Sequence, residues 1–176
     1  MNDLRHACLI SFSQNNDTLQ WQPIGDPVMG GRSEGRVAIN AGQGCFSGTV
    51  RPDNGGGFAS AKADLPKPLD AADYTGIEFL ALGDGKTYKV GLRNTTDRRS
   101  PVYQHSFTPP PGEWHRVQLP FTGFVPTWRG KVLTDCEPLD ASRLASVSLF
   151  ISGGQFGEFQ LWMEGWFLYL TKVPFA

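Results

Sequence analysis

The sequence predicts an all-β fold, a two-sheet antiparallel β-sandwich of the jelly-roll type. Apolar residues recur with a period of two along much of the chain, which is typical of strands with one buried face. The chain is rich in glycine (21), proline (13) and aromatic residues (12%), a composition that favours strands joined by many turns. About nine or ten strand candidates in one short chain indicate a sandwich or a barrel, and we expect the sandwich.

Alternation of apolar and polar residues identifies the strands. In the segment ASVSLFISGG, Val147, Leu149 and Ile151 alternate with serines, as a half-buried strand requires. In GIEFLALG, Leu80 and Leu82 add a second apolar face, which predicts a central strand covered on both sides. In chain order, we expect strands at residues 36–40, 45–51, 58–64, 77–82, 88–93, 103–108, 114–120, 146–152, 158–163 and 166–171.

Turn sequences separate these strands: NAGQG, DNGGG, GDGK, PPPGE and SGGQFG. Glycine and proline supply the backbone dihedral angles that such turns need. Short helix-like segments are expected only at residues 71–74 and 139–145. Because no linker, low-complexity segment or internal repeat interrupts the pattern, we expect residues 1–176 to form a single β-sandwich domain.

Charge and cysteine content argue against several classes of function. The net charge is −1 and the chain has no basic or acidic block, so nucleic acid is not an expected partner. Cys8, Cys45 and Cys136 lack CxxC spacing, which argues against a disulfide framework or a zinc site and favours reduced, largely buried thiols. The apolar run at residues 7–10 is too short for a signal sequence, and no window approaches the ~18 apolar residues of a membrane span. We therefore expect a cytoplasmic protein, with a peripheral position on the inner face of the membrane left open.

The segment GDPVMGGRSEG, residues 25–35, nearly matches a phosphate-binding loop. Gly25 and Gly30 have the Walker A spacing, but Gly31 stands where the lysine must be. A phosphate-binding loop also leads into a helix, whereas the segment RVAIN that follows is strand-like. The segment is therefore not expected to bind phosphate.

The same segment contains GRSEG, a match to the short G-x-S-x-G motif around Ser33. A nucleophile elbow lies between a strand and a helix of an α/β sheet, and this chain offers no such context. A serine hydrolase that pairs Ser33 with His105 or His115 is one alternative. The histidines are not spaced for a shared metal site, and no aspartate-rich calcium loop is present. We expect no catalytic residues, no cofactor and no metal.

The hairpin of residues 36–40 and 45–51 brings two glycine-rich loops together. Because hairpin strands are antiparallel, GDPVMGGRSEG before the first strand and PDNGGGF after the second should meet at one end of the sandwich. The loops either close the sandwich, with Met29 and Phe58 as plugs, or form a binding surface. The candidate partner-binding residues are Trp21, Asp26, Met29, Gly30, Gly31, Ser33, Asn54, Gly56, Gly57 and Phe58.

These residues also carry a family resemblance. Trp21, Asp26, the segment VMGG and Ser33, followed by FSG and NGGGFAS and later by GEFQLWMEGWFLY, resemble the complex I intermediate-associated protein family over about residues 10–170. The resemblance implies a galactose-binding-like jelly roll and a non-enzymatic chaperone role in assembling respiratory complex I (NADH:ubiquinone oxidoreductase). It also implies that the partners are protein subunits of a membrane-associated complex. Because no mitochondrial transit peptide is present, a bacterial stand-alone member is expected.

Carbohydrate or small-ligand binding is the second alternative, because jelly rolls often bind sugars on aromatic platforms. Trp114, Trp128, Trp162 and Trp166 are the candidates. Trp162 alternates out of phase with its apolar neighbours, so it is expected to face outward. Aromatic residues in strands more often belong to the core, which weighs against this alternative.

Overall fold

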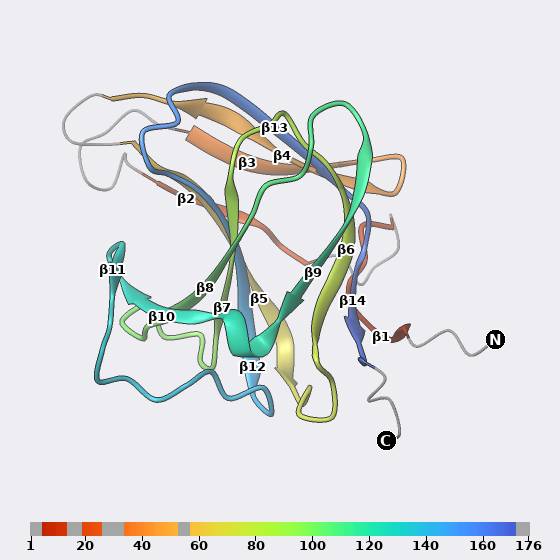
Figure 1. The fold of residues 1–176 in the computed structure, drawn as a ribbon, viewed down its shortest axis with the longest axis vertical. Coiled ribbons are helices and arrows are strands. Elements are labelled where there is room, and N and C mark those ends of the chain that lie inside the picture. Colours follow the sequence, from red (N-terminus) through yellow and green to blue (C-terminus); the bar gives the residue numbers. More distant parts are fainter. Residues whose placement is uncertain (1–4, 14–18, 26–33, 53–56, 172–176) are drawn as a thin grey trace.

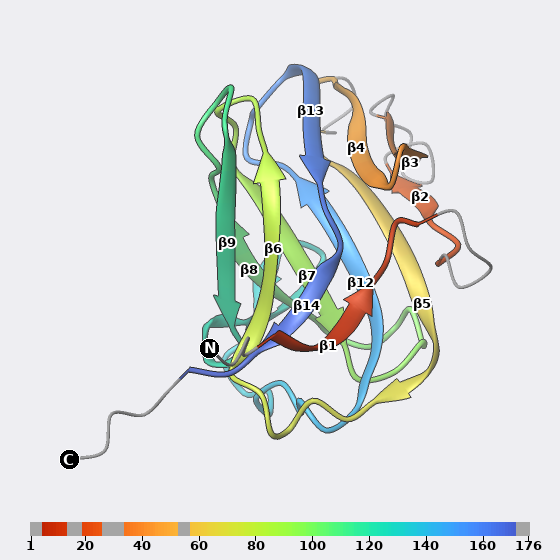
Figure 2. The ribbon, with the colours of Figure 1, turned by 90° about the vertical axis from the view of Figure 1, so that its right-hand side faces the viewer.

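The computed structural model describes residues 5–13, 19–25, 34–52 and 57–171, which form two antiparallel β-sheets packed face to face (Figures 1 and 2). The predicted all-β sandwich is therefore confirmed. Sheet A has the order β1-β14-β6-β13-β4-β3, and β9 pairs with β6 as well. Its strands are β1 (Arg5–Ile10), β3 (Glu34–Asn40), β4 (Gln43–Val50), β6 (Gly76–Leu82), β9 (Trp114–Pro120), β13 (Gly157–Met163) and β14 (Trp166–Tyr169).

Sheet B has the order β11-β10-β8-β7-β12-β5-β2. Each strand expected from the sequence overlaps an observed strand of one sheet or the other. The strands of sheet B are β2 (Gln22–Gly25), β5 (Ala59–Leu69), β7 (Tyr88–Arg93), β8 (Val102–Phe107), β10 (Val125–Trp128), β11 (Lys131–Val132) and β12 (Leu144–Ile151).

Aromatic side chains fill the space between the sheets. Trp166 is fully buried and stacks on Phe79, with ring centroids 4.9 Å apart. Phe46 lies edge-on to Tyr88 at 6.2 Å and is equally buried. Such rings bury large apolar areas and favour these offset and edge-to-face arrangements. The core thus joins strands of sheet A to β7 of sheet B.

The turn predicted at NAGQG joins β3 to β4 as a tight hairpin. Asn40 pairs with Gln43, which leaves a two-residue loop of Ala41 (φ 50°) and Gly42 (φ 80°). Two consecutive positive φ angles define the type I′ turn, whose twist matches that of the flanking strands. The local sequence therefore fixes the register of this hairpin.

Two predictions about strand faces are wrong. Ser146 and Ser148 on β12 are buried, so this strand is covered on both faces and not on one. Residues 94–100 lie over that face, because the Lys62 ammonium beside Ser148 donates to the Thr96 carbonyl oxygen at 3.4 Å. Leu80 on β6 is 38% exposed, so the outer face of that strand is not fully covered.

The two helix-like segments are also not helices. Residues 71–74 form a turn, closed by the hydrogen bond from Tyr74 N to the Ala71 carbonyl oxygen at 3.0 Å. Residues 139–145 end in strand β12, and the Asn94 side chain donates to the Asp140 and Arg143 carbonyl oxygens, which a helix would use itself. In the part of the chain that the structure describes, no helix is long and apolar enough to cross a membrane.

Candidate partner-binding end of the sandwich

The strands that lead into both glycine-rich loops end side by side. Gly25, at the end of β2, pairs with Ala59 at the start of β5. Glu34, at the start of β3, pairs with Thr49 near the end of β4. The hairpin argument thus places the entry and exit of both loops correctly. The predicted residues Asp26, Met29, Gly30, Gly31, Ser33, Asn54 and Gly56 lie outside the described residues.

Of the remaining predicted residues, Gly57 and Phe58 lie at this end and Trp21 does not. Trp21 precedes β2 at the strand end opposite Gly25, roughly 13 Å away at the usual rise per residue. Its half-buried ring packs edge-on against Trp166, with centroids 6.4 Å apart, so its contact is with the core.

Sequence reasoning missed Phe156, which joins Gly57 and Phe58 at this end. A Cβ atom added to Gly57 would lie 3.4 Å from the Phe156 ring, and Phe156 is 50% exposed. The two segments meet because Ile151, at the end of β12, pairs with Ala59. The sequence signal for Phe156 was its position inside the glycine-rich turn SGGQFG, where an aromatic side chain cannot easily be buried in the core.

A groove of about 970 Å³ opens at the same end, and we call it the end groove. Acidic, basic and apolar residues line it together. This mixture suits a protein surface better than a single charged ligand. The lining residues are Pro23, Ile24, Glu34, Gly35, Arg36, Ser47, Gly48, Thr49, Asp84, Lys86, Glu158, Phe159 and Gln160.

Gly48 allows the two strands that bound the end groove to approach closely. A Cβ atom at this position would lie 1.9 Å from the Glu34 carbonyl oxygen, a backbone atom that cannot move aside cheaply. The glycine of the FSG segment thus has a packing reason.

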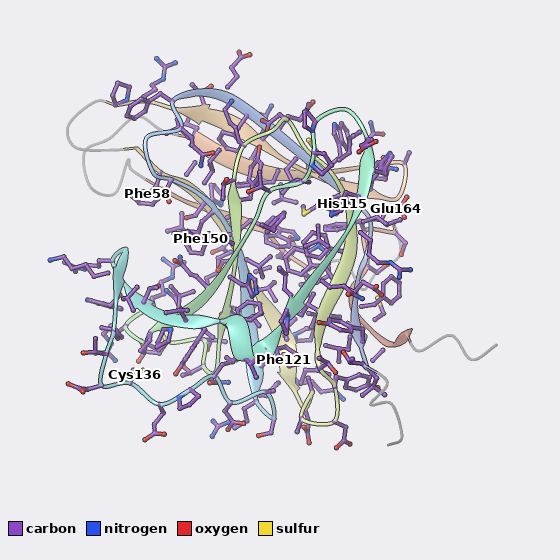
Figure 3. The ribbon with its side chains drawn as sticks, viewed as in Figure 1. Phe58, His115, Phe121, Cys136, Phe150 and Glu164 are labelled. Carbon is purple, nitrogen blue, oxygen red and sulfur yellow. The ribbon has the colours of Figure 1, made fainter. Side chains whose placement is uncertain are left out.

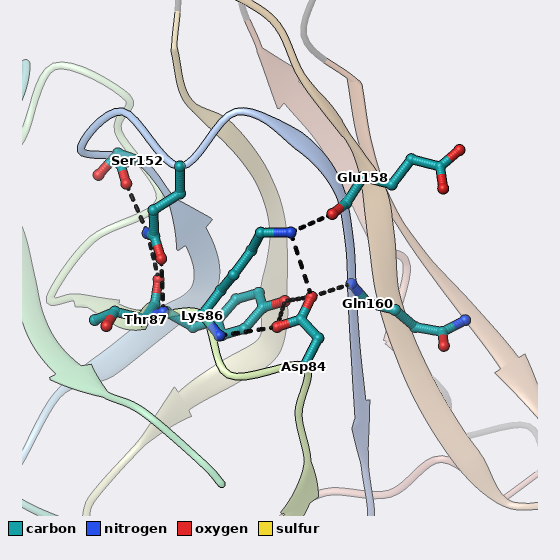
Figure 4. Close-up of polar contacts among 8 residues, drawn as sticks. Asp84, Lys86, Thr87, Ser152, Glu158 and Gln160 are labelled. Atoms are coloured by element: carbon teal, nitrogen blue, oxygen red, sulfur yellow. Dashed lines mark hydrogen bonds and ion pairs between the residues drawn. The ribbon is translucent and has the colours of Figure 1, made fainter. Parts of the chain in front are cut away.

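Asp84 fixes one wall of the end groove (Figure 4). Its carboxylate accepts hydrogen bonds from the Tyr88 hydroxyl at 2.9 Å, the Gln160 backbone N–H at 2.9 Å and the Lys86 backbone N–H at 3.1 Å. The Lys86 ammonium in turn donates to the Glu158 carbonyl oxygen. Burial, together with the Asp84 charge, raises the pKa of Tyr88, so the phenol keeps its proton.

Gln155 fixes the turn that carries Phe156 (Figure 4). Its side-chain oxygen accepts from the Thr87 backbone N–H at 2.7 Å, and its side-chain nitrogen donates to the Thr87 and Ser152 carbonyl oxygens at 2.8 and 2.7 Å. The two bonds to Thr87 tie the turn to the β6–β7 connection, and the bond to Ser152 closes the turn itself. The exposed Phe156 ring is therefore presented from a rigid support.

Of the residues in the hydrolase alternative, the structure describes His105 and His115, and Ser33 lies outside the described residues. The strand β3, which follows Ser33 in the sequence, and the strand β9, which carries His115, are separated by four strand spacings, roughly 19 Å. His105 lies on β8 of the other sheet and packs its ring against Phe124 at 5.3 Å. Among the described residues, no group of three or more His, Cys, Asp or Glu side chains is arranged to hold a metal ion.

The thiols differ from expectation in one respect. Cys45 is buried, and burial raises its pKa, but Cys8 is exposed and Cys136 is half-buried. All three are free, as predicted. Cys8 is exposed because it lies on β1, at the edge of sheet A.

The four candidate tryptophans divide between core and surface. Trp166 is fully buried, and Trp128 is half-buried beneath the Arg129 guanidinium at 5.7 Å. Trp162 is half-buried although its neighbours Leu161 and Met163 are inaccessible, so its predicted outward orientation is confirmed. Trp114 is 39% exposed on the same sheet.

Comparison with known proteins identifies the family. Residues 10–163 match the Complex I intermediate-associated protein 30 (CIA30) family. The chain belongs to this family. It is 26% identical over 190 residues to an uncharacterized protein of Schizosaccharomyces pombe, covering 96% of this chain and 87% of that protein. It is 24% identical over 170 residues to mouse Complex I intermediate-associated protein 30, mitochondrial, covering 85% of this chain but only 52% of the mouse protein.

Among solved structures, this CIA30 family chain resembles carbohydrate-binding modules in fold. The family 11 module of Clostridium thermocellum in complex with a β-1,3-1,4-mixed-linked tetrasaccharide superimposes with a TM-score of 0.66. The match covers 92% of this chain and 95% of the module at 15% identity, so it establishes the shared jelly-roll fold.

Proposed function

We propose that this chain is a non-enzymatic binding and assembly factor that holds a protein subunit of a membrane-associated complex, of which respiratory complex I is the first candidate. Membership of the CIA30 family over residues 10–163 carries this proposal. The name of the mouse relative links the family to complex I intermediates. The role requires no catalysis.

The contact surface in this proposal is the end groove together with Gly57, Phe58 and Phe156. Phe156 is the anchor, since a half-exposed aromatic side chain on a rigid turn loses little entropy on binding. The charged side chains of the groove form the polar rim. A preformed surface of this kind shields an immature subunit until assembly continues, and it acts from the cytoplasmic side, peripheral to the membrane.

Affinity purification from detergent-solubilised cells of the source organism, analysed by mass spectrometry, tests this function. We expect the wild-type chain to enrich complex I subunits, and both Phe156→Asp and Gly30→Asp/Gly31→Asp to lose them. Val132→Asp is the matched control, because Val132 is 63% exposed on β11, away from this end. Circular dichroism establishes that each variant is folded. If the wild type enriches no membrane-complex subunit, the proposal is wrong.

A second function, carbohydrate binding, is favoured by one observation. Trp114 and Trp162 both pair with Leu82 in sheet A, so these three side chains share one outward row. Aromatic and aliphatic side chains in a row form the kind of platform on which sugar rings stack. The family 11 module named above binds a mixed-linked tetrasaccharide. Titration of the chain with that tetrasaccharide, with Trp162→Ala as the variant, tests this function through tryptophan fluorescence.

A further inference from the structure

A second, smaller pocket lies on the outer face of sheet A, and we call it the sheet A pocket. It forms where β6 changes partner, because Ala81 pairs with Met163 of β13 whereas Glu78 pairs with Phe167 of β14. Its volume of about 330 Å³ is at the small end of the range for ligand sites. The lining residues are Ala41, Gly42, Gln43, Glu78, Phe79, Leu80, Arg116, Glu164, Gly165 and Phe167.

A buried carboxylate forms the polar side of the sheet A pocket. Glu78 is only 6% exposed, and its Oε1 atom accepts from the Gln118 side-chain nitrogen at 3.0 Å. The same oxygen forms an ion pair with Arg116 Nε at 3.1 Å. A buried charge is tolerated when it is paired in this way. The second oxygen, Oε2, has no hydrogen-bond partner among the residues that the structure describes, so one acceptor remains for a ligand.

A donor and an apolar surface stand beside this acceptor. The Arg116 side chain is 62% exposed, so its terminal N–H groups are available to a ligand. Leu80 is 38% exposed and Phe167 is half-buried, and both line the pocket. The pocket thus combines a hydrogen-bond acceptor held in place, a hydrogen-bond donor and an apolar patch.

The mixture of charges decides the class of ligand. An anion would meet Glu78 and Glu164, and a cation would meet Arg116. Neutral hydroxyl groups suit both partners, because each hydroxyl donates to a carboxylate and accepts from a guanidinium. The C–H face of a sugar ring suits Leu80 and Phe167. We infer that the sheet A pocket binds one neutral hexose unit of a glycan.

This inference rests on the carbohydrate-binding function proposed above and assigns it a location. The Trp114–Leu82–Trp162 row lies on the same outward face, so a longer glycan can extend from the pocket onto that row. The end groove is a separate surface, since the end groove and the sheet A pocket share no lining residue. Phe58, beside the end groove, and Glu164, in the pocket, lie on opposite sides of the view in Figure 3. A sugar in the pocket and a protein at the end groove do not compete.

Amide chemical shifts of the full chain, followed by NMR during titration, test the inference. The probes are D-glucose, D-galactose and D-mannose, with D-glucuronate and D-glucosamine as charged counterparts. We expect a neutral hexose to shift the amides of Gly42, Leu80 and Gly165, and both charged counterparts to bind more weakly. Glu78→Gln and Arg116→Met should each weaken binding about tenfold or more, because each removes a charge-assisted hydrogen bond.

Glu158→Gln is the matched control, because Glu158 lines the end groove and its loss should leave hexose binding unchanged. Arg116→Met keeps the test valid if Glu78→Gln fails to fold, because Arg116 is largely exposed. Shifts confined to another face would overturn the pocket and leave carbohydrate binding intact. If no hexose or mixed-linked tetrasaccharide shifts any amide, the pocket and the carbohydrate-binding function are both wrong. Stronger binding of a charged sugar would overturn the charge argument.

Discussion

The outer faces of strands β12 and β6 differ in solvent exposure, in the opposite sense to what their sequences predict. The sequence of β12 alternates cleanly, yet Ser146 and Ser148 are buried because residues 94–100 lie over them. The sequence of β6 is apolar on both faces, yet Leu80 is 38% exposed beside the sheet A pocket. Alternation thus predicts the inner face of a strand, whereas the outer face depends on what distant segments place over it.

Truncating a core side chain on the inner face of either strand should destabilise the protein by a similar amount. These substitutions should give the largest loss of stability. Leu149→Ala on β12 and Phe79→Ala on β6 each remove a buried side chain from the shared core. We expect each to lower the free energy of unfolding by about 3–5 kcal/mol, the usual sum of lost burial and cavity. Urea unfolding followed by circular dichroism measures this. A loss below about 1 kcal/mol for only one of the variants would mean that the sheets are not packed alike.

Substitutions on the outer faces of β12 and β6 should change stability by different amounts. Ser148→Leu adds volume beneath residues 94–100 and should cost about 1–3 kcal/mol through overpacking. Leu80→Ser on the exposed face should change stability by no more than about 0.5 kcal/mol. The same urea titration compares the two variants. Equal changes in stability would contradict the conclusion that the outer face of β12 is covered and that of β6 is exposed.

Gly91, on the neighbouring strand β7, allows a further test of how tightly the outer face of β12 is packed. It pairs with Ser148, and a Cβ atom here would lie 2.3 Å from the Ser148 hydroxyl oxygen and 2.8 Å from Phe150 and Val102 side-chain atoms. Gly91→Ala should therefore cost about 1–2 kcal/mol. Combining it with Ser148→Ala relieves the closest contact, so the double variant should recover part of that loss. Simple additivity of the two substitutions would show that the contact is not the cause.

The connection between β6 and β7 should give a small effect at neutral pH. Tyr88→Phe removes the hydrogen bond to Asp84 and should cost about 1 kcal/mol. The pKa of Tyr88 is raised above the ordinary value of 10.0, so the unfolded chain releases this proton first as the pH rises. The stability linked to this group is therefore complete below pH 10 and declines above it. Thermal unfolding at increasing pH measures the decline, which Tyr88→Phe should reduce.

Local patterns predicted the sheets well, because strand alternation and turn chemistry are short-range properties. The Asn40–Gly44 turn and the meeting of the strand ends at Gly25 and Glu34 follow from them. Phe156 and the Glu78–Arg116 pair depend on long-range register, which places β12 beside β5 and β9 beside β6. Strands β1, β2, β10 and β11 were not predicted. Strand β2 was missed because it is four residues long and contains Pro23, and its pairing with β5 supplies the missing stabilisation.

The pairing of β1 with β14 has a consequence for synthesis. Arg5 lies opposite Tyr169, so β1 receives its hydrogen-bonded partner from β14, which is far away in the sequence. During translation, β1 leaves the ribosome long before its partner strand β14 has been synthesised. Its residues Leu9 and Ile10, which are buried in the folded protein, therefore cannot reach their final packing until β14 has emerged. Sheet A is thus completed only after β14 has been synthesised, which makes the pairing of β1 a long-range event.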